Sequence, residues 1–213
     1  MNAIEKKYVE FWNQGTAEDR QEMIASSKMW DMEIPAYLEA LFDWKRVKDT
    51  FKDKTFLDIG CGRGRIMKPL AAVSKKVVGV DISAAMLVDA KTYLEGIKNV
   101  ETVCIGTDGK LPFPANSFDF VYSTMVFQHI PFMDTVKNYV AEIKRVLKPN
   151  GQFVIQTHKG NPVPEGVFAN YHGVFFKDLD RFKNLFIEAG LDVTEAQEKL
   201  LHPDWLWVRG RQK

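Results

Sequence analysis

Two carboxylates and a glycine-rich turn form the stretch of this sequence whose residue types are best suited to bind a ligand. Asp58 lies inside a short apolar run, Gly60 and Gly62 follow it, and Asp81 ends a second apolar run. Glycine lets a backbone turn sharply and approach a ligand closely, and a carboxylate can accept hydrogen bonds from two neighbouring hydroxyl groups. This spacing is typical of a nucleotide site in which the acid holds a ribose.

A strand, a helix and a second strand must position these residues. The apolar run from Phe56 to Ile59 predicts the first strand, and the run from Val77 to Val80 predicts the second. The helix between them would present its unpaired N–H groups at the turn. The sequence therefore predicts a nucleotide-binding β-α-β unit over residues 55–81.

The glycine spacing argues against a dinucleotide enzyme. The pattern G-x-G-x-x-G would place its third glycine at position 65, but Arg65 stands there and the third glycine is Gly64. A Tyr-x-x-x-Lys pair is also absent from the sequence. An NAD(P)-dependent Rossmann oxidoreductase is therefore the weaker alternative.

Four motifs appear together in order: LDIGCGRG, VVGVD, LPFPANSFDFVYS and LKPNG. In this combination the chain resembles the class I S-adenosylmethionine-dependent methyltransferases, of the small-molecule type 11 kind. The resemblance covers residues 55–160 well and implies an α/β fold. That fold is a Rossmann-like, mostly parallel seven-stranded sheet with helices on both faces, an antiparallel last strand and an N-terminal helical cover.

The resemblance also implies roles in binding S-adenosyl-L-methionine. Asp58 would face the methionine part of the cofactor, and Asp81 would hold the ribose. The remaining implied contacts are the turn that passes under the cofactor, formed by Gly60, Cys61 and Gly62, and two apolar residues that flank the adenine, Ile82 and Met86.

The adenine would also meet the loop before the LPFPANSFDFVYS motif. In the family an acidic side chain there accepts a hydrogen bond from the adenine amino group, and the next backbone N–H donates to a ring nitrogen. Thr107 occupies the usual place of the acid and Asp108 follows it. We assign the adenine contact to Thr107, Asp108 and Gly109, and the choice between the first two side chains stays open.

The candidate catalytic residue is His129. It follows the predicted fourth strand, which ends at Ser123, and loops at the carboxyl ends of strands are where open α/β sheets bind ligands. Ser123 is therefore a further candidate for the cofactor site. An imidazole with a pKa of about 6.5 suits a general base at neutral pH, although methyl transfer needs one only when the acceptor carries a proton of high pKa. The alternatives are a structural role for His129 and His158 as the base.

Composition excludes several other classes. The net charge of +1 disfavours nucleic acid, no apolar run approaches a membrane span, and the two cysteines form no disulfide framework. The expected partner is a small-molecule methyl acceptor, in a cytoplasmic setting. We expect no metal site, because the four histidines are widely spaced. A non-catalytic cofactor-binding protein remains a second alternative, and the oligomeric state stays open.

We expect one domain over residues 1–213. Residues 1–52 would be a helical cap, 53–160 the cofactor-binding core, and 161–213 a loop, helix and strands on the substrate side. In the cap, Thr16 predicts a helix N-cap and Pro35 the start of a third helix. Tyr8, Trp12 and Trp30 fit either core packing or a shield over the ligand. Glu142 and Arg145 predict a solvated helix face.

Overall fold

A seven-stranded sheet forms the centre of the protein. The computed structural model describes residues 1–24, 27–160 and 176–213, with the backbone alone between 21 and 33. The strand order is β3-β2-β1-β4-β5-β7-β6, and β7 pairs antiparallel with both β5 and β6 while the other pairs are parallel. The strands are β1 (Thr55–Ile59), β2 (Lys76–Asp81), β3 (Val100–Cys104), β4 (Phe118–Ser123), β5 (Leu147–His158), β6 (Asp192–Glu198) and β7 (Trp205–Arg211). The predicted fold class is confirmed.

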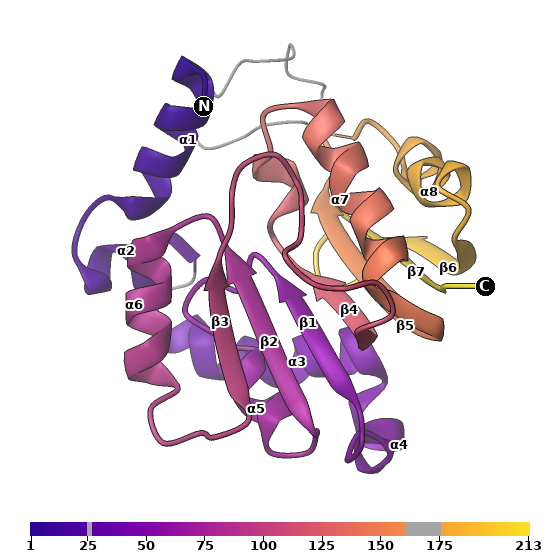
Figure 1. The fold of residues 1–213 in the computed structure, drawn as a ribbon, viewed down its shortest axis with the longest axis horizontal. Helices are drawn as coiled ribbons and strands as arrows, with labels where there is room; N and C mark the ends of the chain where they lie inside the picture. The colour runs from indigo at the N-terminus through magenta and orange to yellow at the C-terminus, as the bar shows by residue number, and fades with distance from the viewer. Residues whose placement is uncertain (25–26, 161–175) are drawn as a thin grey trace.

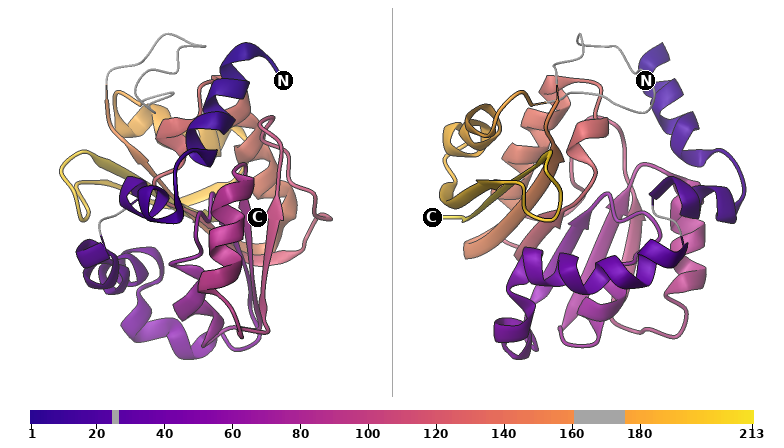
Figure 2. Two further views of the ribbon diagram at one scale, coloured as in Figure 1. Left: turned by 90° about the vertical axis from the view of Figure 1, so that its left-hand side faces the viewer. Right: turned by 180° about the vertical axis from the view of Figure 1, so that it is seen from behind.

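Helices cover both faces of this sheet (Figures 1 and 2). One face packs on α7 (Met133–Val146) and α8 (Leu179–Glu188), and the other packs on α3 (Ser27–Phe42), α5 (Met67–Ala71) and α6 (Ala84–Tyr93). The remaining helices are α1 (Ala3–Asn13), α2 (Ala17–Ile24), α4 (Trp44–Val47) and the short 3-10 helices η1 (Lys48–Thr50) and η2 (Phe127–His129).

The alternation of side chains along β1 explains why a hydrophobic core lies on each face of the sheet. Phe56 packs in the core with α3 and α5, whereas its neighbour Leu57 packs in the core with α7 and α8. Successive side chains of a strand point to opposite faces, so a strand covered on both sides is apolar throughout. Phe120, the partner of Phe56 on β4, stacks on it with the ring centroids 4.8 Å apart.

Two local expectations differ from the structure. Pro35 was expected to begin a helix but lies inside α3, where the apolar residues that follow it pack on the sheet and maintain the helix despite the missing N–H. The segment LKPNG, whose Pro-Asn-Gly run is typical of a turn, forms the start of β5 instead, with Asn150 at φ 60°. The predicted cap at Thr16 is confirmed, since its Oγ1 accepts from the N–H of Asp19 at 3.2 Å.

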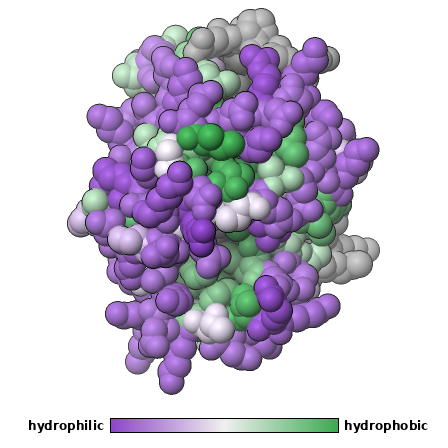
Figure 3. Space-filling view, turned by 90° about the vertical axis from the view of Figure 1, so that its right-hand side faces the viewer, coloured by the Kyte–Doolittle hydropathy of each residue, from purple (hydrophilic) through white to green (hydrophobic). Residues whose placement is uncertain are grey.

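The surface around α8, β6 and β7 is mainly polar, with apolar side chains gathered near the middle of the face (Figure 3). None of the helices in the described residues is both long and apolar enough to cross a bilayer. The parallel strands β1, β2 and β4 all end at the edge of the sheet where α1 lies (Figure 1). That edge is where the candidate site residues gather.

Candidate active site

A pocket opens between the carboxyl ends of the strands and α1. Its lining combines the turn after β1, the end of β2, the loops after β3 and β4, and residues of helices α1, α6 and α7. The lining residues are Asp58, Gly60, Cys61, Gly62, Arg65 and Ile66; Asp81, Ile82 and Met86; Ile105 and Thr107; Thr124, Met125, Val126, His129 and Ile130; Thr135 and Tyr139 of α7; and Tyr8 and Trp12 of α1.

The glycine turn is tied to the neighbouring strand by its backbone. The N–H groups of Gly60 and Cys61 both donate to the carbonyl of Val80, at 2.8 and 3.0 Å. Gly60 has a φ of 74°, and a Cβ placed on it would lie 2.2 Å from Cγ2 of Val126. Only glycine fits this position, because any side chain would meet both backbone strain and the wall after β4.

Asp81 is oriented by two backbone donors. Its Oδ2 accepts from the N–H of Gly62 and its Oδ1 from the N–H of Ser83, both at 2.9 Å. Burial raises the pKa of this carboxyl group, and the hydrogen bonds from Ser83 and Gly62 oppose that rise. Each oxygen keeps a further lone pair, so the carboxylate can accept two vicinal hydroxyl groups from a ligand in the pocket.

Asp58 and Arg65 provide opposite charges on one wall. Asp58 is buried, which raises its pKa to about 7 despite the opposing effects of the Tyr122 hydroxyl and the Arg65 guanidinium. Arg65 is also buried, with its guanidinium carbon 5.1 Å from the centre of the Tyr37 ring. A carboxylate and a guanidinium that line the same pocket can complement the ammonium and carboxylate of an amino acid.

Arg65 is a pocket residue that the sequence alone does not identify. In the sequence it is notable only as a departure from the dinucleotide motif. A charged residue at the start of a helix is usually solvated, and nothing local distinguishes this one. Its burial depends on Tyr37, which belongs to a distant helix.

The loop after β3 places Thr107 in the pocket and keeps Asp108 and Gly109 outside its lining. The Asp108 carboxylate accepts from the N–H of Lys110 at 3.2 Å, and its carbonyl accepts from the side chain of Asn138 at 2.8 Å. Gly109 packs so closely on α7 that a Cβ would lie 2.6 Å from the carbonyl oxygen of Thr135.

Glu142 and Arg145 of α7 form hydrogen bonds with the next part of that loop. Glu142 Oε2 accepts from the N–H of Leu111 at 2.9 Å, and Arg145 donates to the carbonyls of Leu111 and Phe113 at 3.0 and 2.7 Å. Their ion pair, at 2.6 Å, lowers the pKa of Glu142. The expectation of a solvated helix face was wrong, because the loop supplies backbone partners to both side chains.

His129 lies in the pocket next to α1. It is buried, its N–H donates to the carbonyl of Val126 at 2.8 Å, and its ring meets the edge of Trp12 with centroids 5.0 Å apart. Ser123 does not belong to the lining, since it is fully buried and its Oγ donates to the carbonyl of Ile59 at 2.8 Å. The side chain of Trp30 falls outside the described residues.

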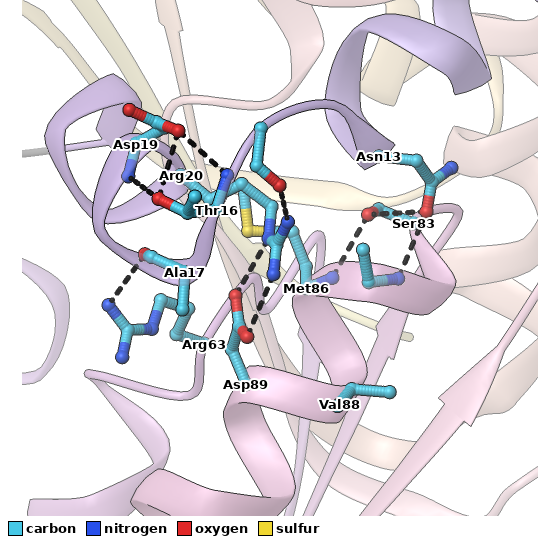
Figure 4. Close-up of polar contacts among 12 residues, drawn as sticks. Asn13, Thr16, Ala17, Asp19, Arg20, Arg63, Ser83, Met86, Val88 and Asp89 are labelled. Atoms are coloured by element: carbon cyan, nitrogen blue, oxygen red, sulfur yellow. Dashed lines mark hydrogen bonds and ion pairs between the residues drawn. The ribbon is translucent and has the colours of Figure 1, made fainter.

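Polar contacts fasten the N-terminal helices to α6 (Figure 4). The Asn13 Oδ1 accepts from the N–H of Ala85 at 2.9 Å, and the Ser83 hydroxyl donates to the carbonyl of Trp12 at 2.8 Å. Because Asp81 accepts from the N–H of Ser83, these bonds link the carboxylate in the pocket to the end of α1. The aromatic residues of α1 are thereby held over the pocket.

A buried ion pair forms the second attachment. Arg20 of α2 donates to both carboxylate oxygens of Asp89 on α6, at 2.7 and 2.9 Å, and to the carbonyl of Gly15 at 2.7 Å. The two side chains are 10% and 7% exposed. Bidentate pairing of this kind fixes orientation as well as distance.

Comparisons with known proteins agree with this geometry. Residues 57–155 match the family model described as "Methyltransferase domain". The N-terminal Xaa-Pro-Lys N-methyltransferase 1 of Homo sapiens is 34% identical over 71% of this chain and 67% of its own length. The chain belongs to the class I S-adenosylmethionine-dependent methyltransferases. The resemblance seen in the sequence is thus confirmed.

Other relatives of this methyltransferase differ more in length. The tRNA U34 carboxymethyltransferase of Cellvibrio japonicus is 33% identical over 62% of this chain, and the match spans only 44% of the relative. Among solved structures, a SAM dependent methyltransferase from Aquifex aeolicus aligns with a TM-score of 0.61 and 25% identity, over 86% of this chain and 96% of the other. The oxidoreductase alternative is therefore not supported.

The pocket of the methyltransferase fits S-adenosyl-L-methionine, the cofactor of its family. The cradle at Gly60 admits no side chain, Asp81 presents oxygens suited to the ribose hydroxyls, and Asp58 with Arg65 complements the methionine zwitterion. Ile82 and Met86 supply apolar surface in the pocket next to the Asp81 carboxylate. These residues would hold the cofactor, whose sulfonium supplies the activated methyl group.

We expect Asp81→Asn to weaken the binding of S-adenosylhomocysteine about ten- to hundredfold, because a hydrogen bond to a charged group contributes about 1.5–3 kcal/mol. Isothermal titration calorimetry measures this change. Asp134→Asn removes the same charge at an exposed position, 88% exposed, and should leave the affinity intact. Unchanged affinity in a folded Asp81→Asn protein would contradict the ribose assignment.

We expect Arg20→Met to loosen the N-terminal helices, since removing one partner of a buried pair costs about 3–5 kcal/mol. Hydrogen exchange should rise in peptides from residues 3–24, and the double variant Arg20→Met/Asp89→Leu should recover much of the protection. Arg46→Met, which breaks an exposed pair with Asp43, is the matched control and should change little. Equal exchange in the Arg20 and Arg46 variants would show that the buried pair is not an anchor.

Proposed function

We propose that this methyltransferase transfers a methyl group to a small-molecule acceptor bound in the pocket beside His129 and the aromatic residues of α1. The observation that carries this proposal is the continuity of one pocket from the Asp81 carboxylate to His129, with Tyr8 and Trp12 on its wall. Acceptor and cofactor can thus meet within a single crevice. Most of the wall near His129 is apolar, through Trp12, Ile130 and Tyr139.

The wall of the pocket limits the shape of the acceptor. Helix α1 is fastened to α6 on the far side of the crevice, so a bulky folded acceptor would have to displace it. The net charge of +1 offers little general attraction for a polyanion. These features support a small molecule over the RNA or protein acceptors that the names of two relatives indicate.

The proposed reaction is an in-line displacement at the methyl carbon. Asp58 and Arg65 would orient the methionine end, and the glycine turn would hold the cofactor against the end of β1. Such alignment is the main requirement of methyl transfer. His129 would take the proton from an acceptor hydroxyl or ammonium group. The side-chain nitrogen of Gln128 lies 3.4 Å from Nε2 of His129.

The direct test incubates the protein with S-adenosylmethionine labelled in the methyl group. A metabolite extract, a protein extract and an RNA extract serve as separate acceptor pools, and mass spectrometry follows the label. Label in a metabolite would support the proposal, whereas label in protein or RNA alone would overturn the small-molecule part. Binding of the cofactor without transfer to any pool would favour the non-catalytic alternative.

We expect the affinity for S-adenosylhomocysteine to rise with pH around pH 7. Asp58 has a pKa of about 7 in the ligand-free protein, and only its ionised form attracts the ammonium group of the ligand. Below pH 7 binding must displace the proton, so affinity falls as the pH falls. Calorimetry at several pH values measures the slope. The Asp58→Asn protein should bind S-adenosylhomocysteine more weakly, with an affinity that changes little with pH. An affinity independent of pH in the unaltered protein would contradict the assignment of Asp58 to the ammonium group.

We expect His129→Ala to lower kcat about 10²- to 10⁴-fold with the identified acceptor, since this is the usual contribution of a general base. Cofactor affinity should hardly change, and the pH profile of kcat should lose its acidic limb. His158→Gln tests the competing base in the same assay. Near-normal turnover of His129→Ala with an unaltered profile would leave His129 a structural role.

A further inference from the structure

We propose that His158, His202 and Asp204 form a binding site for a divalent transition-metal cation. Each residue offers one ligand atom, and these atoms all lie within 4.8 Å of one another. The sequence predicted no metal site because the histidines are far apart along the chain. Pairing of β7 with β5 brings them together, since Trp205 at the start of β7 is the register partner of His158 at the end of β5.

One ligand of this cluster is already oriented by the backbone. The Nδ1 atom of His158 lies 2.7 Å from the carbonyl oxygen of Lys159, a distance suited to an N–H donor. Histidines that bind metals usually donate their other ring N–H to such a group, which fixes the ring and leaves Nε2 as the ligand. His158 therefore presents the tautomer that a cation requires.

The segment before β7 fixes the other two residues. The ring of His202 stacks on Trp205, with centroids 5.4 Å apart. The N–H of Asp204 donates to Nδ1 of His202 at 3.2 Å, which holds the ring beside Asp204. A cation would bind this ring through Nε2, with release of the proton that Nε2 carries in this tautomer. The N–H of Lys159 donates to the carbonyl of Asp204 at 2.6 Å. The Asp204 residue is exposed, so its carboxylate can turn toward the imidazoles at little packing cost.

The donor set selects the class of cation. Two imidazoles with one carboxylate suit Zn²⁺ and neighbouring transition metals, whereas Ca²⁺ and Mg²⁺ prefer oxygen ligands alone. Three protein ligands also leave coordination positions for water or another molecule. Bound there, the cation would tie the segment before β7 to the end of β5.

The site lies on the edge of the sheet that also carries the methyltransferase pocket. Gln156, two residues before His158 on β5, accepts from the N–H of Met125 in the pocket wall at 2.6 Å. A cation at His158 would therefore stabilise the strand end that supports this wall. The proposal stands independently of the methyl acceptor.

The test titrates Zn²⁺ into the full chain after treatment with a chelator and dialysis. Calorimetry should detect saturable binding of one Zn²⁺ per chain. His202→Gln and Asp204→Asn should each weaken binding about tenfold or more, because losing a ligand costs at least as much as losing a group that orients one. Asp134→Asn removes an equal charge at an exposed residue that is not part of the cluster, and it should bind Zn²⁺ as the unaltered protein does.

A second measurement separates loss of the metal site from loss of the fold. The affinity for S-adenosylhomocysteine should stay the same in His202→Gln and Asp204→Asn, since neither residue lines the cofactor pocket. The proposal would be overturned by the absence of saturable Zn²⁺ binding. It would equally be overturned by unchanged Zn²⁺ affinity in His202→Gln.

Discussion

The arrangement of the pocket depends on one partly buried carboxylate and its backbone donors. Asp81 accepts from the N–H groups of Gly62 and Ser83, so the end of β2, the glycine turn after β1 and the start of α6 share a single anchor. Removing a carboxylate even partly from water is costly without hydrogen-bond donors, and here the donors are supplied by the backbone that forms the cofactor cradle. Folding and ligand binding therefore use the same group.

This anchor also connects the two ends of the pocket. Ser83 donates its hydroxyl to the end of α1, and α1 carries Trp12 against His129. The wall of the proposed acceptor site is thus fastened to the residue that would hold the ribose. Arg20 and Asp89 strengthen the same attachment at a second point on α6. The pocket consequently belongs to the assembled chain and not to the β-α-β unit alone.

Family membership identifies the cofactor chemistry but leaves the acceptor to the details of the pocket. The relatives include proteins named for tRNA and for protein N-termini, and the chain spans less than half of the tRNA enzyme. A fold shared by many enzymes does not select a substrate. Under the proposed function, the features that would select the acceptor are the apolar residues around His129 and the position of α1, both of which lie outside the glycine motif.

The sequence by itself determined the sheet, the glycine turn and the placement of Asp58 and Asp81, because these depend on local patterns of apolar residues, glycines and acids. Tertiary structure decided the rest. The Arg65 guanidinium packs on the ring of Tyr37. Glu142 and Arg145 form hydrogen bonds with the backbone of Leu111. The pairing of β5 with β7 brings His158 close to His202. Each of these contacts joins residues that are distant along the chain. Local spacing carries no signal for them, since their partners are selected only when the strands and helices pack.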